Sequence, residues 1–489
     1  MMKKGAIVAC VVALIVALAY GLRDKREVTT NSAEAYMKYR KGIELANKFY
    51  FEEALACFER ATQLDTGFAM AFCRLGVSCR NYGRIEEARE ALAKAVELAP
   101  NTTEKEQLII SFHNAHTNRD YTTAREMIEK LAQRYSKAIE PYEYRGNEYL
   151  RLRQYEKGII EFERILKIDP NYAPAYNQLG YAYAYLSHYD KAIANMKKYV
   201  FLSPDQPNPH DSLGEIYLIM GRYDEAITEF NKARVLKPDF AFAIDHLGRA
   251  YQYKGMYRKA ISYFEKGAAT STNQWIRNSS QIQIARTHYE RGDYEQSLSL
   301  LEKIPADGPQ LYILKWLMGL NYTELGVVHK AVEQREQLEH LILQEEQRDV
   351  HERYGELYTL RMKMYVGHLS AKIASANGTH DKAIEHFQNI LAQPLWPREE
   401  VFFRTAFAEA LFKSRDTDKA IAELEKVVAI NPNYSHSRYL LGRIYDELGH
   451  IQKAVSEMEK FLLIMDGCDE GIPQVEETKQ RFSEIKGTS

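Results

Sequence analysis

Cysteine is scarce in this chain, and its placement gives no sign of a disulfide framework. Five cysteines occur in 489 residues, and those outside an apolar N-terminal run are Cys57, Cys73, Cys79 and Cys468. Their spacing indicates unpaired thiols rather than bridges or a C-x-x-C metal or redox motif. Disulfides are therefore not expected to hold the fold, and the cysteines do not decide which side of a membrane the chain occupies.

Catalytic signatures and concentrated positive charge are lacking as well. The chain contains no G-x-x-x-x-G-K-[ST], H-E-x-x-H or G-x-S-x-G motif, and 65 basic residues balance 67 acidic ones without a basic run. The histidine pair His113 and His116 has no nearby cysteine to complete a zinc site. We therefore expect no enzyme activity, metal, cofactor or small-molecule substrate, and no nucleic-acid partner.

One long apolar run stands at the N-terminus. Ala6–Leu22 holds 17 residues without a charge, between Lys3 and Lys4 on one side and Arg23 on the other. This is the short end of what spans a bilayer, so we interpret it as an uncleaved single-pass anchor. The alternative is a signal peptide cleaved after Ala17-Leu18-Ala19, which has the A-x-A form. Counting basic residues does not fix the orientation, because both flanks carry them.

What the chain has in abundance is a repeat of 34 residues. The recurring glycines are Gly42, Gly76, Gly146, Gly180, Gly214, Gly248, Gly319 and Gly442. A fixed period of this length is typical of a helix–turn–helix unit that must stack on copies of itself to bury its apolar face.

One repeat, Ala173–Gln206, shows the pattern. Tyr176, Leu179, Gly180 and Tyr183 trace one apolar helix stripe, and Ala192, Met196 and Tyr199 trace a second. Small residues at positions 8 and 20 allow two helices to approach closely, and proline at position 32 ends the second helix. Each repeat therefore predicts a pair of packed helices.

This pattern resembles the tetratricopeptide repeat, of the kind found in bacterial membrane-anchored proteins. Twelve repeats are expected, beginning at Ala35, Ala69, Lys105, Ile139, Ala173, Pro207, Ala241, Asn278, Tyr312, Met364, Val401 and Ser435. The resemblance implies an all-α fold, an α-solenoid of about twelve helix–turn–helix repeats wound into a right-handed superhelix. The recurring residues are packing residues, so they say little about activity.

A break between the ninth and tenth repeats divides the array into two expected lobes. The segment Glu346–Lys363 is charged but lacks proline, which favours extra helix over a loose tether. The expected organisation is an anchor or signal segment over 1–27, a first lobe of nine repeats over 35–345, a helical spacer over 346–363, a second lobe of three repeats over 364–468 and a capping helix over 469–489.

The resemblance also indicates where a partner would bind. In tetratricopeptide arrays the first helix of each repeat lines a concave groove, and the residues at groove positions here are rich in tyrosine, amide and charged side chains, which suit the capture of an extended peptide or a helix. They are Tyr144, Asn147, Arg151, Asn177, Gln178, Tyr181, Tyr185, Asp211, Glu215, Asp245, His246, Arg249 and Tyr253.

Together these observations favour a non-catalytic scaffold or adaptor that binds a protein or peptide partner in its groove. We expect it in the bacterial inner membrane as a single-pass protein, with its repeats on the extracytoplasmic side, or as a secreted periplasmic binding protein if the N-terminal segment is cleaved. The rival hypothesis is an enzyme or enzyme subunit with a site at the lobe junction, where His351, Glu352, Glu356 and His368 occur.

Overall fold

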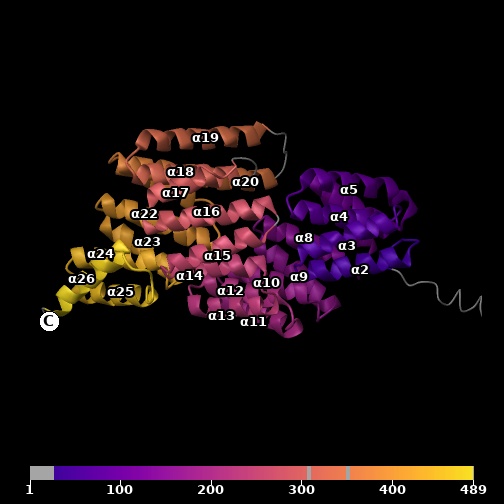
Figure 1. The fold of residues 1–489 in the computed structure, drawn as a ribbon, viewed down its shortest axis with the longest axis horizontal. Helices are drawn as coiled ribbons and strands as arrows, with labels where there is room; N and C mark the ends of the chain where they lie inside the picture. Colours follow the sequence, from indigo (N-terminus) through magenta and orange to yellow (C-terminus); the bar gives the residue numbers. More distant parts are fainter. Residues whose placement is uncertain (1–26, 272, 306–309, 348–352, 488–489) are drawn as a thin grey trace, which may run out of the picture. The chain divides into compact units, whose positions relative to one another are not determined.

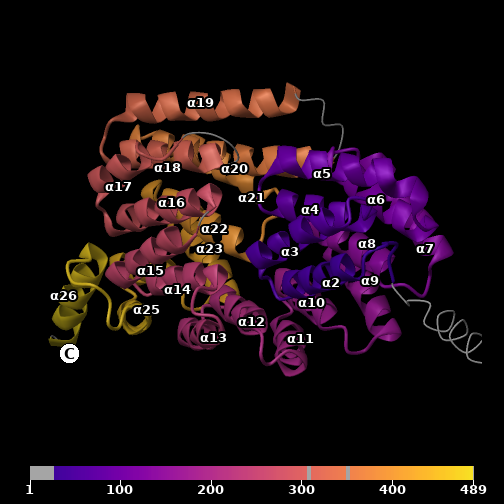
Figure 2. The same ribbon diagram turned by 45° about the vertical axis from the view of Figure 1, so that its right-hand side comes forward.

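The structure is a computed structural model that describes residues 27–271, 273–305, 310–347 and 353–487. These residues fall into two compact units, divided between Ser136 and Lys137, and each is built from helices (Figures 1 and 2). We refer to them as the N-terminal unit and the C-terminal unit.

The N-terminal unit holds three helix pairs. Its helices are α2 (Ala33–Asn47), α3 (Phe51–Leu64), α4 (Ala69–Asn81), α5 (Ile85–Leu98), α6 (Glu104–Thr117) and α7 (Tyr121–Arg134), with one 3-10 turn, η1 (Ala99–Asn101). Each helix contacts the next along the chain, as expected for stacked repeats. The chain enters α2 along a segment in which Thr29 donates to Glu106 from both its backbone nitrogen, at 2.8 Å, and its hydroxyl, at 2.7 Å.

The C-terminal unit holds nine pairs and a final helix. Its helices are α8 (Glu140–Arg151), α9 (Tyr155–Ile168), α10 (Ala173–Tyr185), α11 (Tyr189–Leu202), α12 (Pro207–Ile219), α13 (Tyr223–Leu236), α14 (Ala241–Tyr253), α15 (Tyr257–Thr270), α16 (Gln274–Arg291), α17 (Tyr294–Leu301), α18 (Leu311–Glu324), α19 (Val328–Gln347), α20 (Arg353–Ala376), α21 (His380–Leu391), α22 (Pro397–Lys413), α23 (Thr417–Ile430), α24 (Ser435–Glu447), α25 (Ile451–Ile464) and α26 (Pro473–Gly487).

The two units together hold the twelve expected helix pairs, so the prediction of an all-α helical repeat solenoid is confirmed. The expected starts at Ala173, Pro207 and Ala241 coincide with the first residues of α10, α12 and α14. Both views place α25 and α26 beside α14 and α15, which are far from them in the sequence.

The recurring glycines lie where the two helices of a pair approach most closely, except Gly319 of α18, which faces Leu369 of α20. A Cβ atom on Gly180 would stand 2.6 Å from Met196 Cε, and one on Gly214 would stand 2.5 Å from Phe230 Cε1. In both pairs the obstructing residue is at position 24 of the same repeat. The prediction that position 8 must be small is therefore confirmed by the packing.

The break after the ninth repeat lengthens the helices on both of its sides. Helix α19 has 20 residues and α20 has 24, and α18 contacts α20 as well as α19. Residues 353–363 of the expected spacer belong to α20, and residues 348–352 lie outside the described residues. The division into compact units falls at Ser136 instead of this break, so the two lobes remain a sequence-based division.

The last helix, α26, covers the end of the array. It contacts α25 and buries Val475, Thr478 and Ile485. The expected anchor or signal segment lies almost wholly in residues 1–26, outside the described residues. In the part of the chain that the structure describes, no helix is both long enough and apolar enough to cross a bilayer.

Candidate protein-binding face

The first helices of successive repeats form one layer of the C-terminal unit. Helix α10 contacts both α8 and α12, and α12 contacts α14. We call the side of this layer that carries the expected groove residues of α8, α10, α12 and α14 the inner face. Those residues are brought together by the repeat, because groove positions recur on the same side of each first helix.

The α8 part of the inner face is the most open. Asn147 and Arg151 are exposed, and Tyr144 is half-buried. The remaining expected residues, on α10, α12 and α14, are half-buried or buried, and Asn177 and Asp211 are only 5% and 3% exposed. Gln178 is half-buried.

A hydrogen-bonded cluster joins α10, α12 and α14 across the inner face. The hydroxyl of Tyr181 donates to Glu215 Oε2 at 2.8 Å, and His246 Nδ1 lies 3.0 Å from Asp211 Oδ1. Burial alone would lower the pKa of His246, but the carboxylates of Asp211 and Glu215 outweigh it and raise that pKa to about 9. His246 is therefore an imidazolium at neutral pH and balances part of the buried negative charge.

The next pair of charges reaches solvent. Arg249 Nε donates to Asp245 Oδ2 at 2.7 Å, one helical turn away, and the two side chains are 25% and 29% exposed. Tyr253 stacks on Tyr223 with ring centroids 5.5 Å apart. A charged pair beside flat aromatic rings offers both ionic and stacking contacts to a partner.

A residue that the sequence did not single out covers part of this face. The ring of Trp396, just before α22, stacks on Tyr185 with centroids 5.7 Å apart and an angle of 15° between the planes. The guanidinium groups of Arg153 and Arg361 lie over the Trp396 ring at 4.8 Å and 4.7 Å. Tyr185 was expected to face an open groove, and in this structure it faces the chain itself.

Helix α22 also influences the cluster electrostatically. Burial would raise the pKa of Glu215, but His246, Arg398 of α22 and the hydroxyl of Tyr181 hold it below its usual value. Trp396 and Arg398 lie in a loop and a helix start, where no periodic pattern marks a contact. The only sequence signal was the rarity of tryptophan, which occurs three times in the chain.

The region of the rival enzyme hypothesis is described only in part. His368 of α20 accepts a hydrogen bond from Trp316 Nε1 at 3.0 Å, and burial together with Lys372 lowers its pKa to about 3. It is thus a neutral, hydrogen-bonded residue of a packed interior. The side chains of His351, Glu352 and Glu356 lie outside the described residues.

The histidine pair of α6 lies in the N-terminal unit. His113 is 4% exposed, and burial lowers its pKa well below the usual value, while Arg80 Nη1 lies 2.9 Å from His116 Nδ1. Across the described residues, no three His, Cys, Asp or Glu side chains are grouped closely enough to hold a metal ion.

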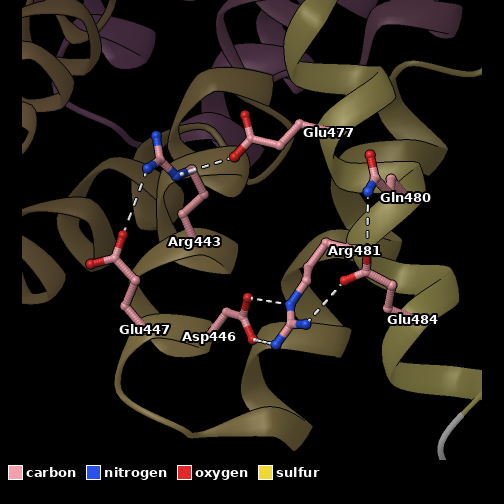
Figure 3. A network of polar contacts seen from close by, with 7 residues as sticks. All are labelled: Arg443, Asp446, Glu447, Glu477, Gln480, Arg481 and Glu484. Atoms are coloured by element: carbon pink, nitrogen blue, oxygen red, sulfur yellow. Dashed lines mark hydrogen bonds and ion pairs between the residues drawn. The ribbon is translucent and has the colours of Figure 1, made fainter.

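A cavity of about 310 Å³ opens between α24, α25 and α26. Ion pairs cross it: Arg481 of α26 binds both carboxylate oxygens of Asp446, at 2.7 and 3.0 Å, and Arg443 of α24 lies 3.5 Å from Glu477 (Figure 3). The side chains of Arg443 and Arg481 are 42% and 44% exposed, so these pairs hold the final helix at the surface with little net free energy each.

Comparisons with known proteins agree with the repeat pattern. Family models described as tetratricopeptide repeat match residues 69–102, 139–172, 161–194, 210–239, 243–273 and 411–467. An uncharacterized protein of Methanocaldococcus jannaschii, MJ0572, is 33% identical over 75 residues, which make up 15% of this chain and 87% of that protein.

Two solved structures match this chain at low identity. The Cut9–Hcn1 hetero-tetramer of the APC/C is 13% identical, with 92% of this chain and 84% of that chain covered and a TM-score of 0.44. PilW, a type IV pilus biogenesis factor, is 22% identical, with 41% and 91% covered and a TM-score of 0.34. Neither likeness says what this chain binds. The matched repeats and the twelve helix pairs show that the chain belongs to the tetratricopeptide repeat family.

Proposed function

We propose that this protein is a scaffold that docks a protein or peptide partner on its inner face and performs no chemistry itself. The N-terminal segment anchors it as a single-pass protein in the bacterial inner membrane, with the repeats on the extracytoplasmic side. A secreted periplasmic form is the alternative, if the segment is cleaved after Ala19.

One observation carries the docking proposal: charged side chains on the inner side of the layer still reach solvent. Asp245 and Arg249 of α14 are 29% and 25% exposed. Side chains needed only for packing would be apolar or fully paired away from water. Solvent-reaching pairs beside tyrosine rings suit recognition of a polar, mixed-charge peptide.

The partner can be trapped by photo-crosslinking in living cells. A benzophenone amino acid is placed at Asn147 or Arg249 on the inner face, and at the exposed Lys191 of α11 as the matched control. We expect inner-face positions to yield a discrete cross-linked product that the control position does not. An equal product from Lys191 would contradict inner-face docking.

A charge swap gives a second test that keeps the fold. Replacing Asp245 with Arg and Arg249 with Asp preserves the ion pair within α14 but reverses the charges offered to a partner. Capture by the Asn147 cross-linker should fall about tenfold or more, as expected for disruption of a binding hot spot. The Asp245→Asn/Arg249→Gln variant separates loss of charge from reversal of charge.

A further inference from the structure

Three contacts join early repeats of the C-terminal unit to its last loops. Arg153 donates to the carbonyl oxygen of Pro394, and its guanidinium also lies 3.3 Å from the carboxylate of Glu399, in the first turn of α22. Asn433 Nδ2 donates to Gly221 O at 3.0 Å. The backbone nitrogen of Asp469 donates to the oxygen of Gly255, also at 3.0 Å. We call this line of contacts the seam.

The seam follows from the repeat itself. Each early partner lies in the turn between the two helices of a pair, and each late partner lies in the loop before α22, α24 or α26. The contact of Gly221 with Asn433 and a further bond beside Gly255, from Arg258 to Asp469, span 212 and 211 residues, whereas the contact of Arg153 with Pro394 spans 241. The first two contacts therefore join turns and loops that are the same number of repeats apart, and the contact of Arg153 spans one repeat more.

Glycine is required at the seam for close approach as well as for the turn. Gly221 and Gly255 have φ angles of 74° and 69°, and a Cβ atom there would stand 2.0 Å from Asn431 Oδ1 and 2.3 Å from Met465 Cε. Gly292 and Gly449 occupy the same kind of turn, with φ angles of 92° and 71°, but nothing lies within 4 Å of a Cβ placed on them. The chain therefore contains its own matched controls.

The chemistry of the seam differs from that of the faces between neighbouring repeats. Asn431 Nδ2 donates to Tyr223 Oη at 3.3 Å, with both residues buried, and the Arg153–Glu399 pair has side chains only 9% and 12% exposed. Apolar and aromatic contacts accompany these bonds: Met465 packs near Gly255, Tyr253 contacts Tyr434, and Tyr185 stacks on Trp396. Water can replace most of these polar bonds, whereas separating neighbouring repeats would expose their apolar cores.

We propose that the seam is a reversible closure that regulates access to the inner face. When it opens, Trp396 leaves Tyr185 and the half-buried residues of α10 and α12 become available to a partner. This inference rests on the proposed docking function, because it names the step that admits the partner. Opening leaves every repeat packed on its neighbours, so it costs less free energy than global unfolding.

Hydrogen exchange of the full chain, followed by mass spectrometry, tests the closure without any partner. The amide of Arg258 lies in the first turn of α15 and donates to Asp469 Oδ2 at 2.8 Å, so its protection reports the seam. In the parent protein we expect the Arg258 and Asp469 amides to exchange at least tenfold faster than amides in the middle of α14 and α15. Equal rates would mean that the seam opens only on global unfolding, which would overturn the proposal.

The matched variants sharpen this test. Asparagine tolerates the left-handed region better than other residues with a Cβ atom, so Gly221→Asn/Gly255→Asn adds bulk with little backbone strain. It should speed exchange at Arg258 and Asp469 by a further tenfold or more. The control Gly292→Asn/Gly449→Asn should leave both rates unchanged. Equal acceleration by the two variants would overturn the proposal, because strain and not the seam would then be responsible.

Cross-linking from Arg249 in the seam variant then separates the two hypotheses. Capture should rise severalfold over the parent, since more molecules are open. If the Arg258 and Asp469 amides exchange faster but no inner-face cross-linker captures more partner, docking on the inner face is rejected and the seam stands as a closure. Capture without faster exchange would reject the seam as the gate and leave docking in place.

Discussion

The close approach of paired helices predicts a graded response to adding one methyl group. Alanine at Gly214 would place its Cβ 2.5 Å from Phe230 Cε1, and the Phe230 ring is fully buried. Alanine at Gly442 would place its Cβ 3.2 Å from Met458 Cγ, so a shift of a few tenths of an ångström relieves the contact. Gly180 lies between these cases, because its neighbour at 2.6 Å is the flexible end of Met196.

Two opposing free energies set the size of each effect. Replacing glycine with alanine inside a helix stabilises it by about 1 kcal/mol, whereas overpacking a rigid core costs about 1–3 kcal/mol. We therefore expect Gly214→Ala to lower the free energy of unfolding by up to about 2 kcal/mol. Gly442→Ala should lie within about 1 kcal/mol of the parent, with either sign. Gly180→Leu, with three more carbon atoms, should be more damaging than Gly180→Ala.

The assay must resolve single repeats, since long repeat arrays do not unfold as one two-state system. Native-state hydrogen exchange measures protection in α12 and α13 for Gly214→Ala, and in α24 and α25 for Gly442→Ala. Protection should fall mainly in the mutated repeat and its neighbours. Equal loss of protection in the two variants would refute the argument, because it would show that the contact distance does not set the cost.

Three further predictions concern acid stability, the inner face and the anchor. His368 has a pKa of about 3 in the fold because burial and Lys372 disfavour its proton, whereas in the unfolded chain its pKa is near 6.5. This residue therefore lowers the free energy of unfolding by up to about 1.4 kcal/mol per pH unit as the pH falls from 6.5 towards 3. The variant His368→Gln keeps an acceptor for Trp316 and should reduce the loss of stability at acid pH, and an unchanged pH dependence would reject this. Tyr181→Ala/Tyr185→Ala should destabilise the seam region by about 1–3 kcal/mol, because Tyr185 stacks on Trp396, and hydrogen exchange there should show it. The full-length protein should stay in the membrane fraction after carbonate washing, and recovery of a soluble form beginning at Tyr20 would instead indicate a cleaved signal.

The sequence predicted the helix pairs because their packing is local and periodic. Gly214 and Phe230 lie in the same repeat, so their contact recurs at a fixed spacing that a pattern can reveal. The starts of three repeats were less accurate: α16 begins at Gln274, α20 at Arg353 and α22 at Pro397, ahead of the expected Asn278, Met364 and Val401. The periodic pattern includes only the residues that pack against a partner helix. Extra polar turns at the N-terminus of a helix therefore leave no periodic signal in the sequence.

The inner face was predictable to the level of residue position but not of surroundings. Numbering each repeat placed Tyr181 and Glu215 on one layer, and the structure joins them by a hydrogen bond of 2.8 Å. The stack of Tyr185 on Trp396 could not be foreseen, because it depends on how far the superhelix turns over several repeats. Small changes in the angle between neighbouring repeats add up along the array, and the residues of a single repeat do not reveal the total rotation.

The polar character of the inner face supports the proposed alternation of closure and docking. The apolar stripes of each repeat pack between its own two helices and against the next repeat; the contact of Gly214 with Phe230 is an example within one repeat. The side of the first helices left over is polar, because it must be stable in water whenever the array is open. The late repeats meet it through Trp396, which lies between two arginines and stacks on Tyr185, and they meet the adjoining turns through Asn433 and Glu399. Water or a bound peptide can replace such hydrogen bonds and ion pairs. A partner can therefore displace the late repeats if it supplies similar polar and aromatic contacts to the inner face.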